Sequence, residues 1–211
     1  MIANAPNPFP LGYEPCMDVS PLLLPDEASY FQTIIGVLRW MAELGRIDIA
    51  VEVSQLSSLL TMPRQGHLVN ALHIISYSKI NHNSRLVLDT SYPGIDMSEF
   101  KSNENWAPFY GDVQDTKPLN SPKPLCKEVT LRIFVDSDYA GDKSDRRSRT
   151  GFMIFMNMVM INWHTKKQAT VEGAVFGALF VAMKQGIEAL IGIRFKLQMI
   201  GIKIEGPTYV C

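Results

Sequence analysis

The sequence predicts a mixed α+β protein, in which a helical N-terminal region precedes a strand-rich region and one long helix. Apolar residues recur at helical spacing between residues 30 and 80, whereas apolar and polar residues alternate from Val129 to Asp136. A stretch from Val171 to Met199 is apolar nearly all round, as expected of a helix buried against a sheet. Together these patterns place helices first, then strands, then a helix.

Three helices are predicted between residues 30 and 80. The first runs from about residue 30 to 44 and ends at Gly45, Asp48 caps the second, and Pro63 begins the third. Their spacing predicts an inward-facing set: Ile34, Leu38, Met41, Val53, Leu56, Leu60, Leu72 and Ile75. We therefore expect these helices to pack as one small unit.

Strands are predicted at 84–89, at 129–136 and in a hairpin formed by 151–156 and 159–163. The hairpin turn is unusual, because a two-residue turn favours positive φ at both positions and Met158 fits that poorly. After the long helix, Thr208 to Cys211 begin a further strand. The predicted regions are 1–29, a proline-rich linker; 30–90, helical; 91–128, an irregular linker; and 129–211, the strand-rich domain.

Composition limits the class of protein. The chain has 211 residues, 46% hydrophobic and 19% charged, with a formal net charge of −1. These values fit an ordered globular protein and exclude a uniformly basic nucleic-acid coat, although a local basic patch remains possible. No clean apolar stretch reaches the roughly 18 to 20 residues of a membrane span, and residues 1–15 show no secretory signal pattern.

Cysteine and histidine usage predicts neither disulfides nor a zinc site. The cysteines are odd in number and far apart: Cys16, Cys126 and Cys211. The histidines form no metal-binding spacing: His67, His73, His82 and His164. A reducing compartment follows, without a distinction between cytoplasm and nucleus.

Four stretches, in this order, resemble the end of a copia-type retrotransposon Pol polyprotein. Residues 31–57, FQTIIGVLRWMAELGRIDIAVEVSQLS, are similar to the region after the reverse transcriptase palm, with Ile47 where the family usually has proline. Residues 62–79, MPRQGHLVNALHIISYSK, follow the family's P-x-x-x-H-x-x-x-A pattern. Residues 135–152, VDSDYAGDKSDRRSRTGF, and 161–171, INWHTKKQATV, resemble two motifs of its RNase H domain.

The resemblance implies a fold and a chemistry. It implies an incomplete RNase H-like domain with three antiparallel strands, a long helix and the start of a fourth strand parallel to the first. The implied ancestral activity is cleavage of the RNA strand of an RNA–DNA hybrid by two Mg²⁺ ions held by carboxylates. Neither a membrane nor a small-molecule substrate is an expected partner.

Carried over residue by residue, the resemblance implies an eroded metal site. Asp136 matches the family's first-strand metal-binding aspartate, whereas Asp138 and Asp142 are expected to make loop hydrogen bonds. Leu179 stands where the family has the second carboxylate, a glutamate, and Glu172, seven residues earlier, would lie roughly 10 Å away along a helix. The family's third and fourth carboxylates belong beyond Cys211. One ligand of four is thus expected, with no Mg²⁺ bound productively.

Basic residues near the predicted hairpin allow two interpretations. They are Arg146, Arg147, Arg149, Lys166 and Lys167. As in the family they could contact phosphates of the hybrid, or they could form an ordinary solvated surface.

Three functional hypotheses remain open at this point. The leading one is a truncated, degenerate and non-catalytic Pol fragment. The second is an active two-metal ribonuclease H completed in trans, and the third is a domesticated module that binds nucleic acid or protein without catalysis. Polymerase activity is not expected, because the sequence has no Y-x-D-D turn.

Overall fold

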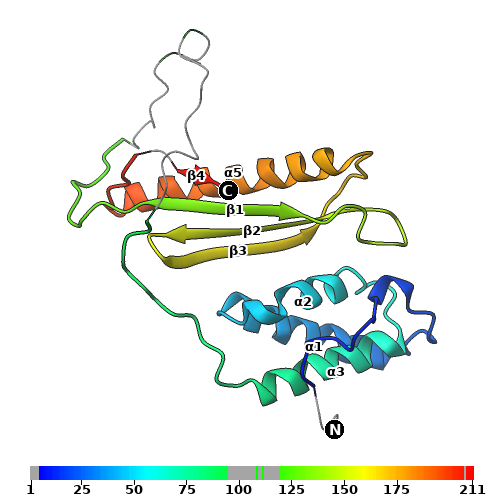
Figure 1. The fold of residues 1–211 in the computed structure, drawn as a ribbon. Coiled ribbons are helices and arrows are strands. Elements are labelled where there is room, and N and C mark those ends of the chain that lie inside the picture. Colours follow the sequence, from blue (N-terminus) through cyan, green and yellow to red (C-terminus); the bar gives the residue numbers. More distant parts are fainter. Residues whose placement is uncertain (1–4, 95–107, 109–110, 112–118, 207) are drawn as a thin grey trace. The chain divides into compact units, whose positions relative to one another are not determined.

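The computed structural model describes residues 5–94, 108, 111, 119–206 and 208–211, and has a mixed α+β fold (Figure 1). Its regular elements are α1 (Pro25–Glu43), α2 (Ala50–Ser57), α3 (Gln65–Ile80), β1 (Leu131–Ser137), β2 (Arg149–Met156), β3 (Val159–Lys167), α5 (Val175–Met199) and β4 (Tyr209–Val210). Short 3₁₀ turns occupy Pro15–Met17 and Ile47–Ile49. The predicted α+β class is therefore confirmed.

The strands form one sheet in the order β3-β2-β1-β4. β1 and β3 run in one direction and β2 in the opposite direction (Figure 1). β4 pairs with β1 in parallel, with Arg132 opposite Tyr209 and Ile133 opposite Val210. The sheet is thus mixed, as the resemblance implied.

The chain divides into two compact units. Unit 1 comprises Met1–Val87, Asp136–Phe152 and Trp163–Ala182, and unit 2 comprises Leu88–Val135, Met153–Asn162 and Met183–Cys211. Strands β1 to β3 and helix α5 each contribute residues to both units.

Helices α1, α2 and α3 of unit 1 share an apolar core. Its buried members are Phe31, Ile34, Ile35, Leu38, Ala42, Ile49, Val53, Leu56, Ala71 and Ile74, and Met41 and Leu60 pack against them. Six of the eight predicted inward positions are thereby confirmed. The other two, Leu72 and Ile75, are wrong, since they are 38% and 40% exposed.

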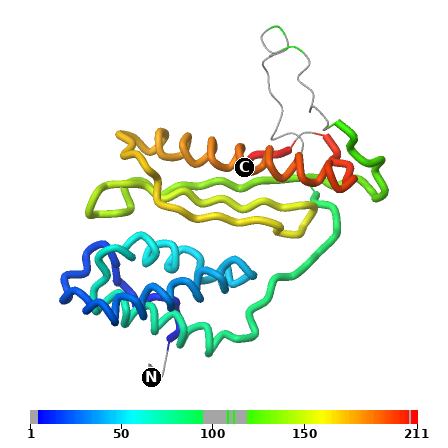
Figure 2. The backbone as a smooth tube through the Cα atoms, turned by 180° about the vertical axis from the view of Figure 1, so that it is seen from behind, coloured from blue at the N-terminus to red at the C-terminus, as the bar shows by residue number. Residues whose placement is uncertain are grey.

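On α3 the buried face is largely polar. His67, Asn70, His73 and Ser78 are buried together with Ile74. Two of these side chains hydrogen-bond backbone carbonyl groups of the N-terminal segment, which runs among the helices (Figure 2, dark blue). The helix is therefore rotated relative to its apolar stripe, because those hydrogen bonds satisfy polar groups that would otherwise be costly to bury.

Three local predictions are corrected. α1 begins at Pro25, five residues before the predicted start, because proline suits the first helical position and Glu27 accepts a hydrogen bond from the N–H of Leu24 at 3.0 Å. Asp48 does not cap α2 but pairs with Arg46 at 2.8 Å. Residues 84–89 form no strand.

The β2–β3 turn explains the unusual Asn157-Met158 pair. Asn157 has φ +55°, a left-handed conformation that asparagine tolerates better than most residues. Its Oδ1 accepts the N–H of Thr130 at 3.0 Å, and its own N–H donates to the carbonyl of Thr130 at 2.8 Å. The turn is thus fixed to the residue that precedes β1.

In unit 2 the chain returns alongside β1 after α5 ends. Val129 N–H donates to Lys203 at 2.9 Å, Glu205 N–H donates to Val129 at 2.8 Å, and Cys211 N–H donates to Ile133 at 2.9 Å. The predicted strand after Gly206 is therefore present and pairs with β1 in the predicted orientation.

Two further findings concern particular segments. By length and composition alone, α5 is the one helix among the described residues that could cross a membrane. The absence of a membrane partner therefore stays a prediction. The aromatic residues expected to anchor the 91–128 linker, namely Phe100, Trp106, Phe109 and Tyr110, lie outside the described residues.

Candidate functional site

The candidate site is built on the end of β1 and on the loop that leads to β2. Asp136 lies near the end of β1 with an exposed side chain, and its Oδ1 accepts the N–H of Ser137 at 2.8 Å. Alternation along β1 places Leu131 and Ile133 in the core, so Asp136 is the first carboxylate that the strand presents to solvent.

Asp138 and Asp142 hold the shape of the loop, which we call the polar loop (residues 138–149). Asp138 Oδ1 accepts the N–H of Arg149, and Gly141 permits this because a Cβ atom there would overlap the Asp138 carboxylate. Asp142 Oδ1 accepts the N–H of Ser144 at 3.0 Å. Both aspartates thus make the loop hydrogen bonds that the sequence analysis expected.

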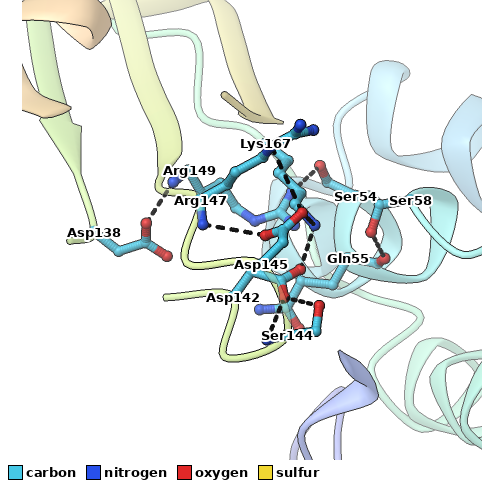
Figure 3. A network of polar contacts seen from close by, with 10 residues as sticks. All are labelled: Ser54, Gln55, Ser58, Asp138, Asp142, Ser144, Asp145, Arg147, Arg149 and Lys167. Carbon is cyan, nitrogen blue, oxygen red and sulfur yellow. Dashed lines mark hydrogen bonds and ion pairs between the residues drawn. The ribbon is translucent and has the colours of Figure 1, made fainter. Parts of the chain in front are cut away.

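Lys167 at the end of β3 pairs with two aspartates of the polar loop. Its Nζ lies 2.6 Å from Asp142 Oδ2 and 2.8 Å from Asp145 Oδ2 (Figure 3). Burial alone would raise the pKa of Asp142, but hydrogen bonds from Lys167 and Ser144 lower it to about 2. Burial opposes the charge of Lys167 too, yet the two carboxylates raise its pKa above the ordinary value.

The other predicted cations fall into two groups. Arg149 Nη1 donates to Ser54 Oγ at 2.6 Å, and burial lowers the pKa of this arginine. Arg147 lies 3.6 Å from Asp145. By contrast, Arg146 and Lys166 are exposed, and neither side chain has an ion-pair partner in the described part of the chain. Two of the five predicted phosphate-binding residues are therefore available to a ligand without breaking an existing contact.

A small pocket of about 80 Å³ adjoins the polar loop within unit 1. Its lining includes Asp138, Asp142, Arg147 and Lys167 from the loop and β3. Residues 13–16 of the N-terminal segment line the same pocket. Most of the charged groups here pair with other charged groups of the protein, so few of them are free to bind a ligand.

Comparison with known proteins finds similarity to two Pol polyproteins. The chain aligns over all 211 residues with two retrovirus-related Pol polyproteins of Arabidopsis thaliana, from transposons RE1 and RE2, at 24% and 25% identity. The chain is homologous to a segment of copia-type Pol polyproteins. It spans 12% of the length of each of these relatives.

A third similarity covers less of the Pol-related chain. A stretch of 45 residues, 21% of the chain, is 46% identical to an uncharacterized mitochondrial protein of Arabidopsis thaliana and covers 19% of that protein. No family model matches the chain, and no solved structure matches it significantly. The family resemblance noted from the four motifs is nonetheless confirmed.

Leu179 is the residue that the resemblance aligns with the second carboxylate of the RNase H motif, and its side chain is aliphatic. Leu179 lies in the second turn of α5 and is partly buried. α5 begins at Val175, so Glu172 precedes the helix and does not lie on its face as predicted. Its carboxylate accepts a hydrogen bond from Thr170 at 2.8 Å and lies over Gly177.

The donor set of the Pol-related chain does not fit a pair of Mg²⁺ ions. Within the described residues, no group of three or more His, Cys, Asp or Glu side chains could hold a metal. Asp136 contributes one carboxylate, while the carboxylates of Asp138 and Asp142 already accept loop hydrogen bonds. Mg²⁺ requires several oxygen ligands in near-octahedral geometry, which this arrangement does not offer.

Sequence reasoning gave no role to Gln168, which the structure places at a junction. This residue is 2% exposed, and its Nε2 donates to Ala178 O at 2.9 Å and to Thr150 Oγ1 at 3.2 Å. It therefore connects the end of β3 with β2 and α5 inside unit 1. The only sequence signal was an uncharged amide directly after two lysines in the fourth motif.

Proposed function

We propose that this Pol-derived chain is an RNase H-like segment that does not hydrolyse RNA–DNA hybrids by itself. The order of three strands, a long helix and a fourth strand parallel to the first supports the RNase H-like assignment. The observation that carries the loss of catalysis is Leu179, an aliphatic side chain at the position of the family's second carboxylate.

The electrostatic argument is direct. Two divalent cations about 4 Å apart repel each other by about 17 kcal/mol at an effective dielectric constant of 20, and carboxylates must offset this repulsion. Asp136 supplies a single negative charge. Leu179 adds none and fills space that a hydrated ion would need.

Incubation of the purified chain with a labelled RNA–DNA hybrid tests this proposal. We expect no cleavage in Mg²⁺ or Mn²⁺ beyond that of the Asp136→Asn variant, which is the matched control. Leu179→Glu alone should not restore activity, because the described residues contribute no third carboxylate to the site. Cleavage that disappears in Asp136→Asn would refute the proposal and support a ribonuclease completed in trans.

A second candidate function is nucleic-acid binding without catalysis. The exposed and unpaired Arg146 and Lys166 favour it, because phosphate contacts need cations that are free to reach the backbone. Electrophoretic mobility shift of the same hybrid at several salt concentrations measures this binding separately from cleavage.

A further inference from the structure

The N-terminal segment is attached to α3 by buried histidines. His67 Nε2 lies 3.0 Å from the carbonyl oxygen of Pro15, and His73 Nε2 lies 3.0 Å from that of Asn7. Both histidines are buried, at 2% and 7% exposure. We call residues 5–18 the N-terminal strap.

His67 makes a second hydrogen bond that fixes its protonation state. Its Nδ1 lies 3.0 Å from the backbone nitrogen of Arg64, and an amide N–H can only donate. Nδ1 must therefore accept, and Nε2 must carry the proton that bonds Pro15. A second proton on the ring would turn Nδ1 into a donor facing another donor, at a side chain that is only 2% exposed.

The strap also contacts the polar loop. Tyr13, Glu14, Pro15 and Cys16 line the pocket that the loop forms. Glu14 Oε1 lies 2.6 Å from Lys143 Nζ, which joins the strap to the loop by an ion pair. Pro15, whose carbonyl accepts the hydrogen bond from His67, thus lines this pocket and directly follows Glu14 of the ion pair.

We propose that residues 13–18 form a pH-dependent cover over the polar loop, held closed by neutral His67. Acidification protonates Nδ1, which then faces the N–H of Arg64 as a second donor. The ring has to leave this position, and its hydrogen bond to Pro15 is lost with it, so that the cover opens. Protons bind the open state in preference to the closed one, because burial lowers the pKa of His67 in the closed state. Opening therefore begins as the pH falls below about 6.5, the ordinary histidine value, and levels off below the lowered value.

The groups around His67 determine how strong the effect is. The carboxylate of Asp18 on the strap favours the protonated ring, whereas the guanidinium of Arg64 opposes it. Asp18 is itself held by the hydroxyl of Tyr13 at 2.9 Å and by the N–H of Ser20 at 2.8 Å. From α1 the uncharged ring of Phe31 faces His67, with ring centroids 6.4 Å apart.

Residues 20–23 are anchored in a way that does not depend on pH. Leu23 N–H donates to Pro63, and the N–H of Gln65 donates to Pro21, each at 3.0 Å. The expected opening is therefore confined to the part of the strap that precedes this anchor.

The partly exposed thiol of Cys16 reports on the cover. The rate at which iodoacetamide modifies Cys16 is measured by peptide mass spectrometry in the full chain and in a free peptide of residues 5–24, from pH 8 to pH 5.5. The ratio of peptide rate to protein rate is the protection, and it removes the intrinsic pH dependence of the thiol. We expect protection to fall several-fold towards pH 5.5 in the wild type.

Two variants separate His67 from other titrating groups. His67→Gln keeps a donor and an acceptor without titrating, so its protection should not change with pH. His73→Gln is the matched control and should retain the wild-type pH dependence, because glutamine can still donate to Asn7 and His67 is unchanged. Constant protection in the wild type, or an unchanged pH dependence in His67→Gln, would overturn the proposal.

If His67→Gln does not fold, as judged by circular dichroism, two measurements on the wild type still test the proposal. The midpoint of the Cys16 protection curve should coincide with the His67 titration measured by NMR. Midpoints that differ by more than the experimental error would overturn the proposal, and coinciding midpoints would support it.

Discussion

Replacing Lys167 with methionine removes the cation that lies between Asp142 and Asp145 while keeping the length of the side chain. Lys167 and Ser144 together lower the pKa of Asp142 from 3.8 to about 2, a difference of about 1.8 units. At 1.36 kcal/mol per unit this corresponds to about 2.4 kcal/mol. Solvent screening at a surface loop reduces the share lost with Lys167 to about 1 kcal/mol, which is the expected decrease in the free energy of unfolding at pH 7.

The pH dependence gives this prediction a sign. Because the pKa of Asp142 is lowered in the folded state, its contribution is present above pH 3.8 and is lost as the pH falls through about 2. The difference between wild type and Lys167→Met should therefore shrink towards zero across that interval. NMR titration of Asp142 in the variant should show its pKa moving back towards 3.8.

Urea unfolding followed by circular dichroism measures the effect. Lys166→Met is the matched control, because Lys166 is exposed and its loss breaks no ion pair in the described part of the chain. Equal unfolding free energies for the two variants at pH 7 would refute the reasoning, since the Asp142–Lys167–Asp145 arrangement would then contribute nothing measurable.

For nucleic-acid binding we expect the reverse order of effects. Lys166→Met should reduce the slope of log binding constant against log salt concentration by about 0.9 for the hybrid, the value of one phosphate contact. Lys167→Met should leave that slope unchanged. Asn157→Asp should lower the free energy of unfolding by less than about 0.5 kcal/mol, because aspartate can still accept the N–H of Thr130. Asn157→Gly should lower it by about 1 kcal/mol, because glycine loses this hydrogen bond but tolerates positive φ. Asn157→Ala should lower it by about 2 to 3 kcal/mol, because alanine loses both the hydrogen bond and the tolerance for positive φ. Hydrogen exchange of the Thr130 amide should follow the same order. Gln168→Ala should lower the free energy of unfolding by about 3 kcal/mol and Gln168→Met by about 1. Methionine costs less because it fills the space of the side chain and lacks the buried Oε1, which has no hydrogen-bond partner. Urea unfolding measures both variants, and equal costs would contradict the packing argument.

The strands and the apolar helices could be predicted because their periodicity and their burial agree. In β1, Leu131 and Ile133 are fully buried and alternate with Arg132 and Phe134, which are more exposed. α3 could not be predicted in the same way, since its inward face carries His67 and His73. Their burial depends on carbonyl groups supplied by the strap, 52 and 66 residues earlier in the chain, and no local pattern reveals such partners.

The sequence named candidate site residues, but it did not show how their side chains contact one another. The motif identified Asp136 and the basic residues of the polar loop, and it named Leu179 as the departure from the family. Which cations are already paired was not visible, because the partners Ser54 and Asp145 come from different elements. The start of α5 was missed by four residues because apolar Val171 precedes the helix without joining it.

The parallel pairing of β4 with β1 has a consequence for biosynthesis. Arg132 and Tyr209 are partners in the sheet although 77 positions separate them. At about 5 to 20 residues per second, the ribosome needs roughly 4 to 15 seconds to deliver the partner of β1, whereas the β2–β3 hairpin can form within microseconds once it emerges. During those seconds the outer edge of β1 is an open template for any passing strand. Nascent chains of this protein are therefore most vulnerable to misassembly in that interval, and a chaperone acting there would determine the yield of folded protein.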